Sequence, residues 1–368
     1  EGLGRFEGIP IFVPRSAPGD RLKVRLTERR PSYGRAEIVE VLEPGPGRRQ
    51  PPCPYFERCG GCDLQHLEDD LQTELKAAAA IETLARLGGL APPQHTRVVR
   101  GDAWAYRTRV QLHTAVEEDG ARFGYFARRS HDLVAVDSCP ICRPELERVL
   151  GELPSRCRDR PPERLDLAVG DDGRLSSAPV VEWLRHGEVS ISCAGFDLGF
   201  DARCFFQAHR GLLDEFVDVV VGEDRGGSAY DLYAGVGLFS LPLAQRYERV
   251  LAVESDRVAA RWARINARRN GIANLEVVAR AVESWVEELA SDVDRVVVDP
   301  PRAGLARRIT AGLLARRPRR LTYVSCHPAA MTRDLQRLVG AYQWESLVLI
   351  DLFPQTGHIE AVAQLVAT

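Results

Sequence analysis

Short apolar runs near the N-terminus alternate with polar or basic positions. From Ile9 to Leu42 this alternation is interrupted at Pro18-Gly19 and at the segment from Pro31 to Gly34. A period of two with turn residues between the runs is typical of strands, so this region is predicted to form a small β-barrel or β-sheet module. The run from Pro44 to Pro52 contains too much proline and glycine to continue a sheet. It is predicted to be a linker.

The rest of the chain changes from a mixed pattern to a regular one. Residues Asp70 to Leu87 have the spacing of an amphipathic helix, and Trp104 to Val136 returns to strand-like alternation. From Tyr230 onward, short apolar runs alternate with helical stretches, which is typical of βα units on a parallel sheet. We therefore expect a β module over residues 1–45, a mixed α/β middle domain over 46–203 and a doubly wound α/β domain over 204–368.

Composition excludes several classes of protein. The 368 residues are too many for one compact core, and a content of 45% hydrophobic and 27% charged residues is ordinary for a globular protein. No apolar stretch approaches the roughly 20 residues that span a bilayer, and no leader pattern follows the opening residue Glu1. The nine cysteines, an odd number with several close together, favour metal ligands or nucleophiles over disulfides. We expect a cytoplasmic protein without a membrane partner.

Charge is unevenly distributed along the chain. The formal net charge of −3 does not by itself indicate a nucleic-acid-binding protein. Between Pro301 and Gln343, however, nine arginines stand against one acid, Asp334, so this segment is locally basic. A solvated helix face, or a genome that favours arginine codons, explains these arginines as readily as phosphate binding does. The candidate phosphate contacts are Arg302 and the cluster Arg316, Arg317, Arg319 and Arg320.

A glycine turn follows the first apolar run of the α/β domain. The segment from Tyr233 through Gly235 to Gly237 lies between a predicted strand and a predicted helix, where a ligand can touch the backbone. Glu254 ends the next strand about 20 residues later, where a carboxylate can accept hydrogen bonds from ribose hydroxyls. Together these residues indicate an adenosine cofactor, whereas the glycines alone fit a tight turn in a plain α/β domain equally well.

Three motifs at the ends of later predicted strands add polar side chains to the same edge of the sheet. They are Asp299-Pro300-Pro301-Arg302, Ser325-Cys326-His327-Pro328 and the run from Phe353 to Glu360. With Phe205-Phe206-Gln207 and the cysteine-rich segment from Cys53 to Cys62, they resemble the RNA (uracil-5)-methyltransferases, which use S-adenosylmethionine to make 5-methyluridine. The resemblance covers nearly the whole chain and implies a class I Rossmann-like methyltransferase domain in an α/β protein.

The resemblance implies a covalent mechanism. Carbon 5 of uracil is a poor nucleophile, so a thiolate must first add to carbon 6. Cys326 stands at an abrupt turn after a predicted strand and matches that nucleophile; the alternative is a buried structural cysteine. Glu360 matches the general base that removes the hydrogen of carbon 5 after methyl transfer. The other interpretation of Glu360 is an exposed residue at the edge of the sheet. This fits less well, because Glu360 interrupts an apolar strand.

The resemblance also implies a cofactor site. Asp299 would bind the uracil ring or help to hold the cofactor, although a similar motif occurs in amino-group methyltransferases. Phe205 and Phe206 would stack on a flipped base, or pack in the core. The implied cofactor-binding residues are Gln207, Tyr233, Gly235, Gly237, Glu254 and Asp299.

Two metal sites compete for the N-terminal cysteines. By resemblance, a 4Fe-4S cluster in the middle domain would be held by Cys53, Cys59, Cys62 and Cys139. The alternative is a zinc ion held by two C-x₂-C pairs, Cys59 with Cys62 and Cys139 with Cys142. The strands before the cysteines resemble a TRAM module, an OB-like RNA-binding barrel, and its first strand is expected to be missing here.

Some positions depart from the family pattern and bear on cofactor affinity rather than on the type of reaction. Leu238 and His209 stand where relatives carry asparagine, His327 replaces the asparagine of S-C-N-P, and Ala281 occupies a position that is often an acid or amide. The expected function is methylation of a uridine in RNA, with 23S ribosomal RNA preferred, by a monomer. The alternatives are an amino-group methyltransferase acting on nucleic acid or protein, and a non-catalytic RNA-binding protein on the same scaffold.

Overall fold

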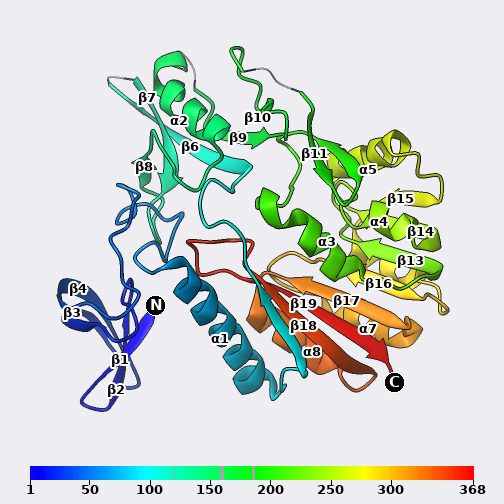
Figure 1. The fold of residues 1–368 in the computed structure, drawn as a ribbon, viewed down its shortest axis with the longest axis horizontal. Helices are drawn as coiled ribbons and strands as arrows, with labels where there is room; N and C mark the ends of the chain where they lie inside the picture. Colours follow the sequence, from blue (N-terminus) through cyan, green and yellow to red (C-terminus); the bar gives the residue numbers. More distant parts are fainter. Residues whose placement is uncertain (119, 158–160, 185–186) are drawn as a thin grey trace.

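The computed structural model describes residues 1–118, 120–157, 161–184 and 187–368, and three parts can be followed in Figure 1. The N-terminal part is a small sheet in the order β1-β2-β4-β3. Ile11, Val13 and Ala36 form its core, as expected from the alternating pattern. Its strands are β1 (Gly2–Phe6), β2 (Ile9–Val13), β3 (Arg21–Arg29) and β4 (Gly34–Glu43).

The middle part is an antiparallel sheet covered by one helix. The strands lie in the order β10-β9-β6-β7-β8, and α2 (Pro144–Arg156) buries Leu146, Leu150 and Leu153 in the core against them. A separate hairpin of β11 (Val189–Cys193) and β12 (Phe196–Phe200) leads on toward the last part. The strands of the sheet are β6 (Arg109–Glu117), β7 (Gly120–Phe126), β8 (Leu133–Ala135), β9 (Arg164–Val169) and β10 (Leu175–Ala178).

The C-terminal part is a large sheet in the order β15-β14-β13-β16-β17-β19-β18-β5. The strands from β15 to β17 are parallel, whereas β19 is antiparallel to both of its neighbours. This is the predicted α/β fold. The strands are β13 (Gly226–Leu232), β14 (Tyr247–Glu254), β15 (Leu275–Ala279), β16 (Arg295–Val298), β17 (Arg320–Ser325), β18 (Tyr342–Ile350), β19 (Glu360–Ala367) and β5 (His95–Val99).

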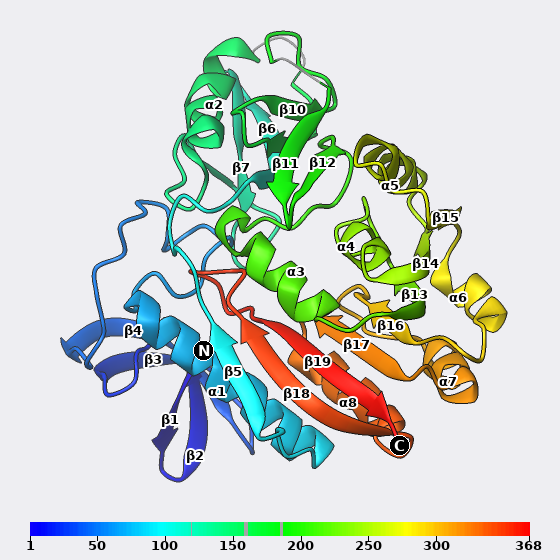
Figure 2. The ribbon, with the colours of Figure 1, turned by 45° about the vertical axis from the view of Figure 1, so that its right-hand side comes forward.

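Helices cover both faces of this sheet (Figure 2). Two hydrophobic clusters lie between the helices and the sheet, one on each face. One face carries α3 (Leu213–Val221), α4 (Ser240–Ala244) and α5 (Arg257–Arg269), with the short helix η1 (Arg210–Leu212) before α3. The other face carries α1 (Asp69–Gly88), α6 (Val282–Trp285), η2 (Val286–Glu288), α7 (Arg307–Arg316) and α8 (Pro328–Leu338). No helix in the described part of the chain is long and apolar enough to cross a membrane.

Two elements from the sequence range 46–203 lie on the large sheet. Strand β5 pairs in parallel with β18, from His95 opposite Ser346 to Val99 opposite Ile350. Helix α1 packs beside α8, and Ala77, Ala80 and Leu84 are buried in the same cluster as the α8 side chains. In space, the segment with α1 and β5 therefore belongs to the C-terminal part. Strand β5 pairs with the backbone edge of β18, which would otherwise be exposed.

A buried ion pair fastens α1 to the large sheet. Lys76 Nζ lies 2.5 Å from Asp351 Oδ1, and both side chains are 3% exposed. Lys76 also donates to the carbonyl of Phe353 at 3.2 Å, and Thr73 donates to Asp351 Oδ2 at 2.9 Å. Burial lowers the pKa of Lys76, and the charge of Asp351 opposes that shift. Each charge is therefore compensated only while α1 stays in place.

We expect Lys76→Met to destabilise the protein by about 3–5 kcal/mol, because the carboxylate of Asp351 is then left buried without a counter-charge. Urea unfolding followed by tryptophan fluorescence measures this loss. Lys23→Met is the matched control, since Lys23 is exposed on β3, and it should change stability by less than about 0.5 kcal/mol. Equal midpoints for the two variants would show that the pair contributes nothing.

Candidate active site

The large sheet brings most of the predicted site residues to one edge. Tyr233, Asp299 and Cys326 directly follow the parallel strands β13, β16 and β17, and Glu254 is the last residue of β14. Glu360 is the first residue of β19, which runs in the opposite direction. The start of an antiparallel strand lies at the same edge as the ends of parallel ones, so these residues gather at the carboxyl edge of the sheet.

The glycine turn leaves room for a ligand. Gly235 has a φ of +54°, and a Cβ atom placed there would meet nothing within 4 Å. At Gly237, with a φ of +94°, a Cβ atom would lie 2.8 Å from Leu241 Cδ1, so glycine is needed for close packing. The turn is fixed by Glu254, whose Oε2 accepts a hydrogen bond from the Gly235 amide at 2.8 Å. The loop thus presents open backbone on one side and is packed on the other.

Asp231, to which the sequence analysis assigned no role, lies one residue before the end of β13, close to the same edge of the sheet. It is fully buried on β13, its Oδ2 accepts a hydrogen bond from Ser240 Oγ, and its Oδ1 has no partner among the described residues. Burial raises the pKa of Asp231 to about 7. A carboxylate inside an otherwise apolar strand was the available signal, because such a group is rarely buried without a purpose.

Cys326, Glu360, Asp299 and Arg302 influence one another electrostatically. Burial raises the pKa of the Cys326 thiol, the charge of Glu360 raises it further, and the Arg302 guanidinium lowers it. Burial also raises the pKa of Glu360 well above its usual range, with a second contribution from Asp299, while Arg302 acts in the opposite direction. Burial and the charge of Asp231 raise the pKa of Asp299 to about 7. The site therefore combines a thiol, a carboxyl group with high proton affinity and a guanidinium.

The turn that carries Cys326 explains one departure from the family pattern. Cys326 lies between the end of β17 and α8, and His327 is the N-cap of that helix. His327 Nδ1 accepts a hydrogen bond from the amide of Ala330 at 3.2 Å. An asparagine side chain would cap a helix in the same way, so His327 preserves the turn behind the cysteine.

His209 and Leu238 have packing roles. The His209 ring is fully buried and stacks on Tyr106, with centroids 4.7 Å apart and planes inclined by 15°. Its Nε2 lies 3.0 Å from the carbonyl oxygen of Asp102. Leu238 is buried in the cluster under α3 and α4. Ala281 is exposed before α6 and adds no polar group to the cofactor edge.

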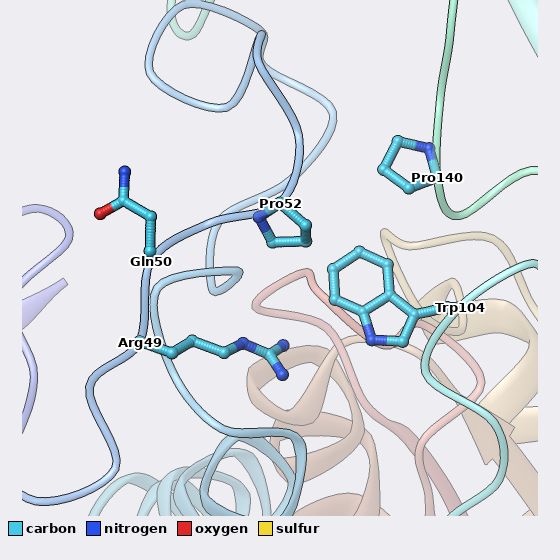
Figure 3. Close-up of a pocket in the computed structure, with 5 residues that line it drawn as sticks. All are labelled: Arg49, Gln50, Pro52, Trp104 and Pro140. Atoms are coloured by element: carbon cyan, nitrogen blue, oxygen red, sulfur yellow. The ribbon is translucent and has the colours of Figure 1, made fainter.

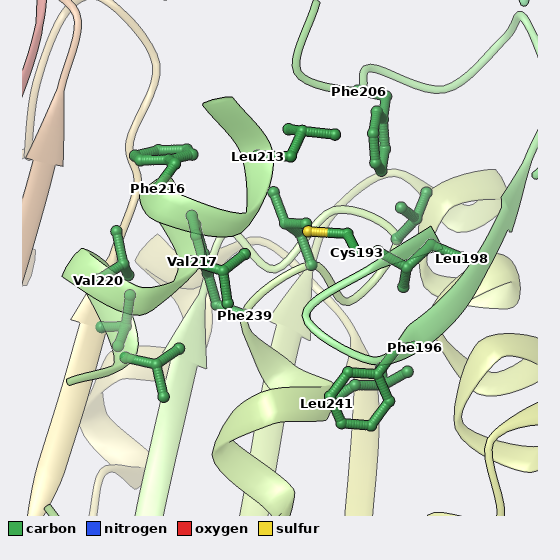
Figure 4. Close-up of a cluster of buried hydrophobic side chains, with 14 of the residues drawn as sticks. Cys193, Phe196, Leu198, Phe206, Leu213, Phe216, Val217, Val220, Phe239 and Leu241 are labelled. Atoms are coloured by element: carbon green, nitrogen blue, oxygen red, sulfur yellow. The ribbon is translucent and has the colours of Figure 1, made fainter. Parts of the chain in front are cut away.

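The Phe205-Phe206-Gln207 segment divides between core and surface. Phe206 is buried and stacks on Phe200 at 4.3 Å, within the cluster drawn in Figure 4. Phe205 is 65% exposed and free to meet a ligand. Gln207 is buried, with 6% of its surface exposed.

Cys326 opens into a cavity of about 1470 Å³ between the N-terminal sheet and the large sheet. Residues of β1, β2 and β3 line one side, α1 lines another, and Cys326, His327 and His358 line a third. A second, smaller hollow of about 440 Å³ lies beside the cysteine-rich segment (Figure 3). There the Arg49 guanidinium lies 5.3 Å from the centre of the Trp104 ring, a cation–π contact.

The four cysteines predicted to hold a cluster lie in one small region. Cys53, Cys62 and Cys139 pack in a cluster with Phe56. Burial raises the pKa of Cys59 and raises that of Cys62 to about 12, and a charge on Cys139 raises both further. Even so, within the described residues no group of three or more His, Cys, Asp or Glu side chains is arranged to hold a metal ion. The structure thus gathers the thiols without showing either the iron-sulfur or the zinc site.

The arginine cluster of the sequence analysis lies away from the site. Arg320 begins β17, so it is separated from Cys326 by the length of that strand, about 20 Å. Arg319 pairs with Asp294, and Arg320 pairs with Asp224 and Glu345. Arg316 and Arg317 bind Ser291 and Thr368. Of the proposed phosphate contacts, Arg302 is the one beside Cys326.

Comparisons with known proteins identify relatives along the whole chain. A family model described as tRNA (Uracil-5-)-methyltransferase matches residues 200–367, and a TRAM domain model matches residues 1–39. The 23S rRNA (uracil(1939)-C(5))-methyltransferase RlmD of Pectobacterium atrosepticum is 32% identical, over 99% of this chain and 90% of its own. The RlmD of Alkalilimnicola ehrlichii is 31% identical, over 98% of this chain and 93% of its own.

A solved structure has the same overall fold. It is that of the Pyrococcus abyssi tRNA (uracil-54, C5)-methyltransferase in complex with S-adenosyl-L-homocysteine. The TM-score is 0.75 at 25% sequence identity, and the match covers 99% of this chain and 97% of the other.

The crowded carboxyl groups predict how stability depends on pH. The unfolded chain releases the proton of Asp299 near the ordinary value, whereas the folded chain holds it because the pKa is about 7. Folding therefore binds a proton in this interval, and the free energy of unfolding falls as pH rises from about 4 to about 7. Asp299→Asn removes this proton uptake. Between pH 5 and 8 the variant should lose less stability than the wild type, by about 1 kcal/mol or more.

Urea unfolding at the two pH values gives this difference. The control is Asp292→Asn, since Asp292 is exposed on the loop before β16. A pH dependence that is the same in wild type and Asp299→Asn would mean that Asp299 is ionised normally in the folded protein.

Proposed function

The chain belongs to the tRNA (uracil-5-)-methyltransferase family and is an S-adenosylmethionine-dependent RNA (uracil-5-)-methyltransferase; from this premise we propose that it methylates carbon 5 of a uridine in 23S ribosomal RNA, with Cys326 as nucleophile and Glu360 as base. The observation that carries the proposal is the grouping of Cys326 and Glu360 at one edge of the sheet, beside a large cavity.

S-adenosylmethionine fits the carboxyl edge of β13, β14 and β16. When bound, it supplies an electrophilic methyl group on a positively charged sulfur. The open backbone at Gly235 leaves space for it, and the remaining lone pairs of Glu254 can accept ribose hydroxyls. The unpartnered Oδ1 of Asp231 suits its charged and polar groups, and the buried side chain of Gln207 is a further expected polar contact. Tyr233, Gly237 and Asp299 complete the expected site.

Cys326 would add to carbon 6 of the uracil ring as a thiolate. The new S–C6 bond pushes electrons onto carbon 5, which can then attack the methyl group. Arg302 favours the thiolate, because its charge lowers the pKa of Cys326 against the effects of burial and of Glu360. Arg302 thus makes a nucleophile available in a site that otherwise disfavours negative charge.

Glu360 would take the proton from carbon 5 after methyl transfer. The electrons of that C–H bond form the C5–C6 double bond, and the electrons of the C6–S bond return to the sulfur of Cys326. A carboxylate with a raised pKa is a stronger base than an ordinary one. The burial that raises the pKa of Glu360 therefore suits it to this step.

The substrate follows from the relatives and from the cavity. Two relatives are named as methyltransferases of uracil 1939 in 23S ribosomal RNA, and we propose the corresponding uridine here. The cavity beside Cys326 is bounded by the strands of the TRAM-like sheet, which resembles RNA-binding modules. A uridine would have to leave its stack to reach Cys326. A cytoplasmic location and a monomeric state remain predictions.

We propose that Cys53, Cys59, Cys62 and Cys139 hold a 4Fe-4S cluster. The support is their common, partly buried region and the donation from the Gly61 amide to Cys59 Sγ at 3.4 Å, since amide hydrogen bonds to sulfur are typical of such sites. Cys142, the additional ligand of the zinc alternative, instead lowers the pKa of Cys139 to about 7 through a side-chain hydrogen bond.

Substitution of Cys326 and Glu360 should stop the reaction at different stages. With S-adenosylmethionine and protein-free fragments of 23S ribosomal RNA, Cys326→Ala should lose methylation and adduct formation, by at least about 10⁴-fold. Glu360→Gln should add and methylate but not eliminate, so a protein–RNA species that survives denaturation should accumulate on gels.

The same assay tests the substrate. Transfer RNA transcripts should be methylated far more slowly than the ribosomal fragments. Activity in Cys326→Ala would refute the covalent mechanism, and preferential methylation of transfer RNA would refute the ribosomal assignment while leaving the chemistry intact.

Anaerobically purified protein should contain iron and sulfide and absorb broadly at about 400 nm, as thiolate-bound clusters do. Cys59→Ser should lose the iron and lower the stability of the middle part, because a group that binds only the folded state stabilises it. Cys157→Ser, at a thiol of the same part that lies outside the proposed ligand set, should retain the iron. Stoichiometric zinc without iron would favour the alternative ligand set with Cys142.

A further inference from the structure

The loop between β18 and β19, residues Asp351 to Ile359, ends at the proposed base. Its central residue, Gln355, is polar yet fully buried and has a left-handed backbone with a φ of +68°. A non-glycine residue in this conformation persists only where its surroundings hold it. Gln355 therefore is a place where other parts of the chain determine the shape of the loop.

Gln355 is held entirely from the N-terminal half of the chain. Its carbonyl oxygen accepts from the amides of Asp63 at 2.7 Å and Leu64 at 2.9 Å. Its own amide donates to Gln72 Oε1 at 3.0 Å, and its side-chain Oε1 accepts from Gln72 Nε2 at 2.9 Å. Its Nε2 donates to Asp69 Oδ1 at 2.9 Å. These bonds satisfy both the backbone and the side chain of one loop residue.

Neighbouring contacts fasten the same loop on both sides of Gln355. Asp63, which directly follows Cys62 in the chain, accepts a hydrogen bond from the Gly357 amide at 3.0 Å and is itself paired with Arg128. Tyr106 donates to the carbonyl of Pro354 at 3.0 Å. The chain after Cys62 thus contacts the loop at Gln355 and Gly357, Tyr106 contacts it at Pro354, and the side chain of Gln355 adds the contacts to α1.

Glu360 depends on this loop more than the rest of β19 does. It pairs with Ile350 of β18, but the pairing of β19 with β17 begins one residue later, at Ala361 opposite Ser325. On the side of Cys326, Glu360 therefore has no ladder partner in the described part of the chain. The loop also carries His358, whose Nε2 lies 2.8 Å from Arg302 Nη2. Displacement of the loop would move both the base and a partner of the guanidinium.

We propose that Gln355 is a positioning residue for elimination: it fixes the loop so that Glu360 faces the carbon 5 proton of the Cys326 adduct. The inference rests on the proposed function. Cys326 follows β17, and Asp299 and Arg302 follow β16, so their backbones are placed by the parallel strands. Among the described residues, the contact of Arg302 with His358 is the one link from the loop to the groups needed for addition. Loosening the loop should slow proton removal, with release of the sulfur, more than it slows addition and methyl transfer.

Gln364, which lies on the same strand as Glu360, provides a matched control for Gln355. Its amide is also held by several hydrogen bonds, from Arg295 and Thr322 to Oε1, each at 2.8 Å, and from Nε2 to the Val219 carbonyl at 2.8 Å. It lies inside the sheet, four residues beyond Glu360. Gln364→Ala should cost a comparable amount of stability without moving the loop.

The experiment is a single turnover on ribosomal RNA fragments that carry tritium at carbon 5 of uridine, with methyl-labelled S-adenosylmethionine. Methyl label in RNA reports addition and transfer, and tritium released to water reports elimination. Gln355→Ala should release tritium about ten- to a hundredfold more slowly than wild type, while methyl incorporation changes by less than about threefold. A denaturation-resistant adduct should accumulate, as in Glu360→Gln, whereas Gln364→Ala should slow the two signals equally and accumulate none.

Two further results would overturn the inference. One is equal slowing of both signals in Gln355→Ala; the other is unfolding of both Gln355→Ala and the isosteric Gln355→Glu, which would make Gln355 a purely structural residue. If Gln355→Ala alone fails to fold, Gln355→Glu is expected to show the same selective loss of tritium release, because its carboxylate faces that of Asp69. Absence of an adduct in Glu360→Gln would instead refute the proposed mechanism itself.

Discussion

The burial of three carboxyl groups at the carboxyl edge of the sheet is the constraint around which the site is organised. Burial is the largest cause that raises the pKa of Asp231, Asp299 and Glu360. The charge of Asp231 adds to the shift of Asp299, and the charge of Asp299 adds to that of Glu360. Water cannot screen them, so the protein must supply positive charge or accept protons. Arg302 is the guanidinium that opposes the effect at Glu360 and at Cys326. One arrangement thereby serves two needs: a base with high proton affinity and a thiol that can still ionise.

Contacts from outside the large sheet hold the segments that carry these carboxyl groups in place. The pair of Lys76 and Asp351 ties α1 to the start of the loop that leads to Glu360. His209 stacks on Tyr106, which in turn binds the carbonyl of Pro354. These contacts join parts of the chain that are far apart in sequence. Strained or repulsive groups persist at a site when the surrounding structure over-determines their positions, and α1 together with Tyr106 and His209 provides that support here.

Local sequence patterns could predict those features of the fold and the site that depend only on residues close together in the chain. The alternation of apolar runs and helices predicted the α/β fold, and parallel strands necessarily bring Tyr233, Asp299 and Cys326 to one edge. Contacts between distant segments could not be predicted in this way. The addition of β5 to the sheet, the cap formed by His327 and the burial of Gln355 all depend on partners that no local spacing reveals. The arginine cluster shows a related limitation. Its charge could be seen in the sequence, whereas its place at the start of β17, far from Cys326, and its acidic partners could not be predicted.

The pairing of β5 with β18 also bears on how the chain is made. His95 meets Ser346 about 250 residues later in the sequence, so β5 leaves the ribosome long before its partner exists. At about 5–20 residues per second, the wait is roughly 12–50 seconds. During that time β5 and the apolar face of α1 have no sheet to cover, and exposed strand edges of this kind favour association between chains. The enzyme is therefore expected to need protection by chaperones until its last strands have been synthesised, and cutting the gene at residue 204 would separate β5 from the sheet it completes.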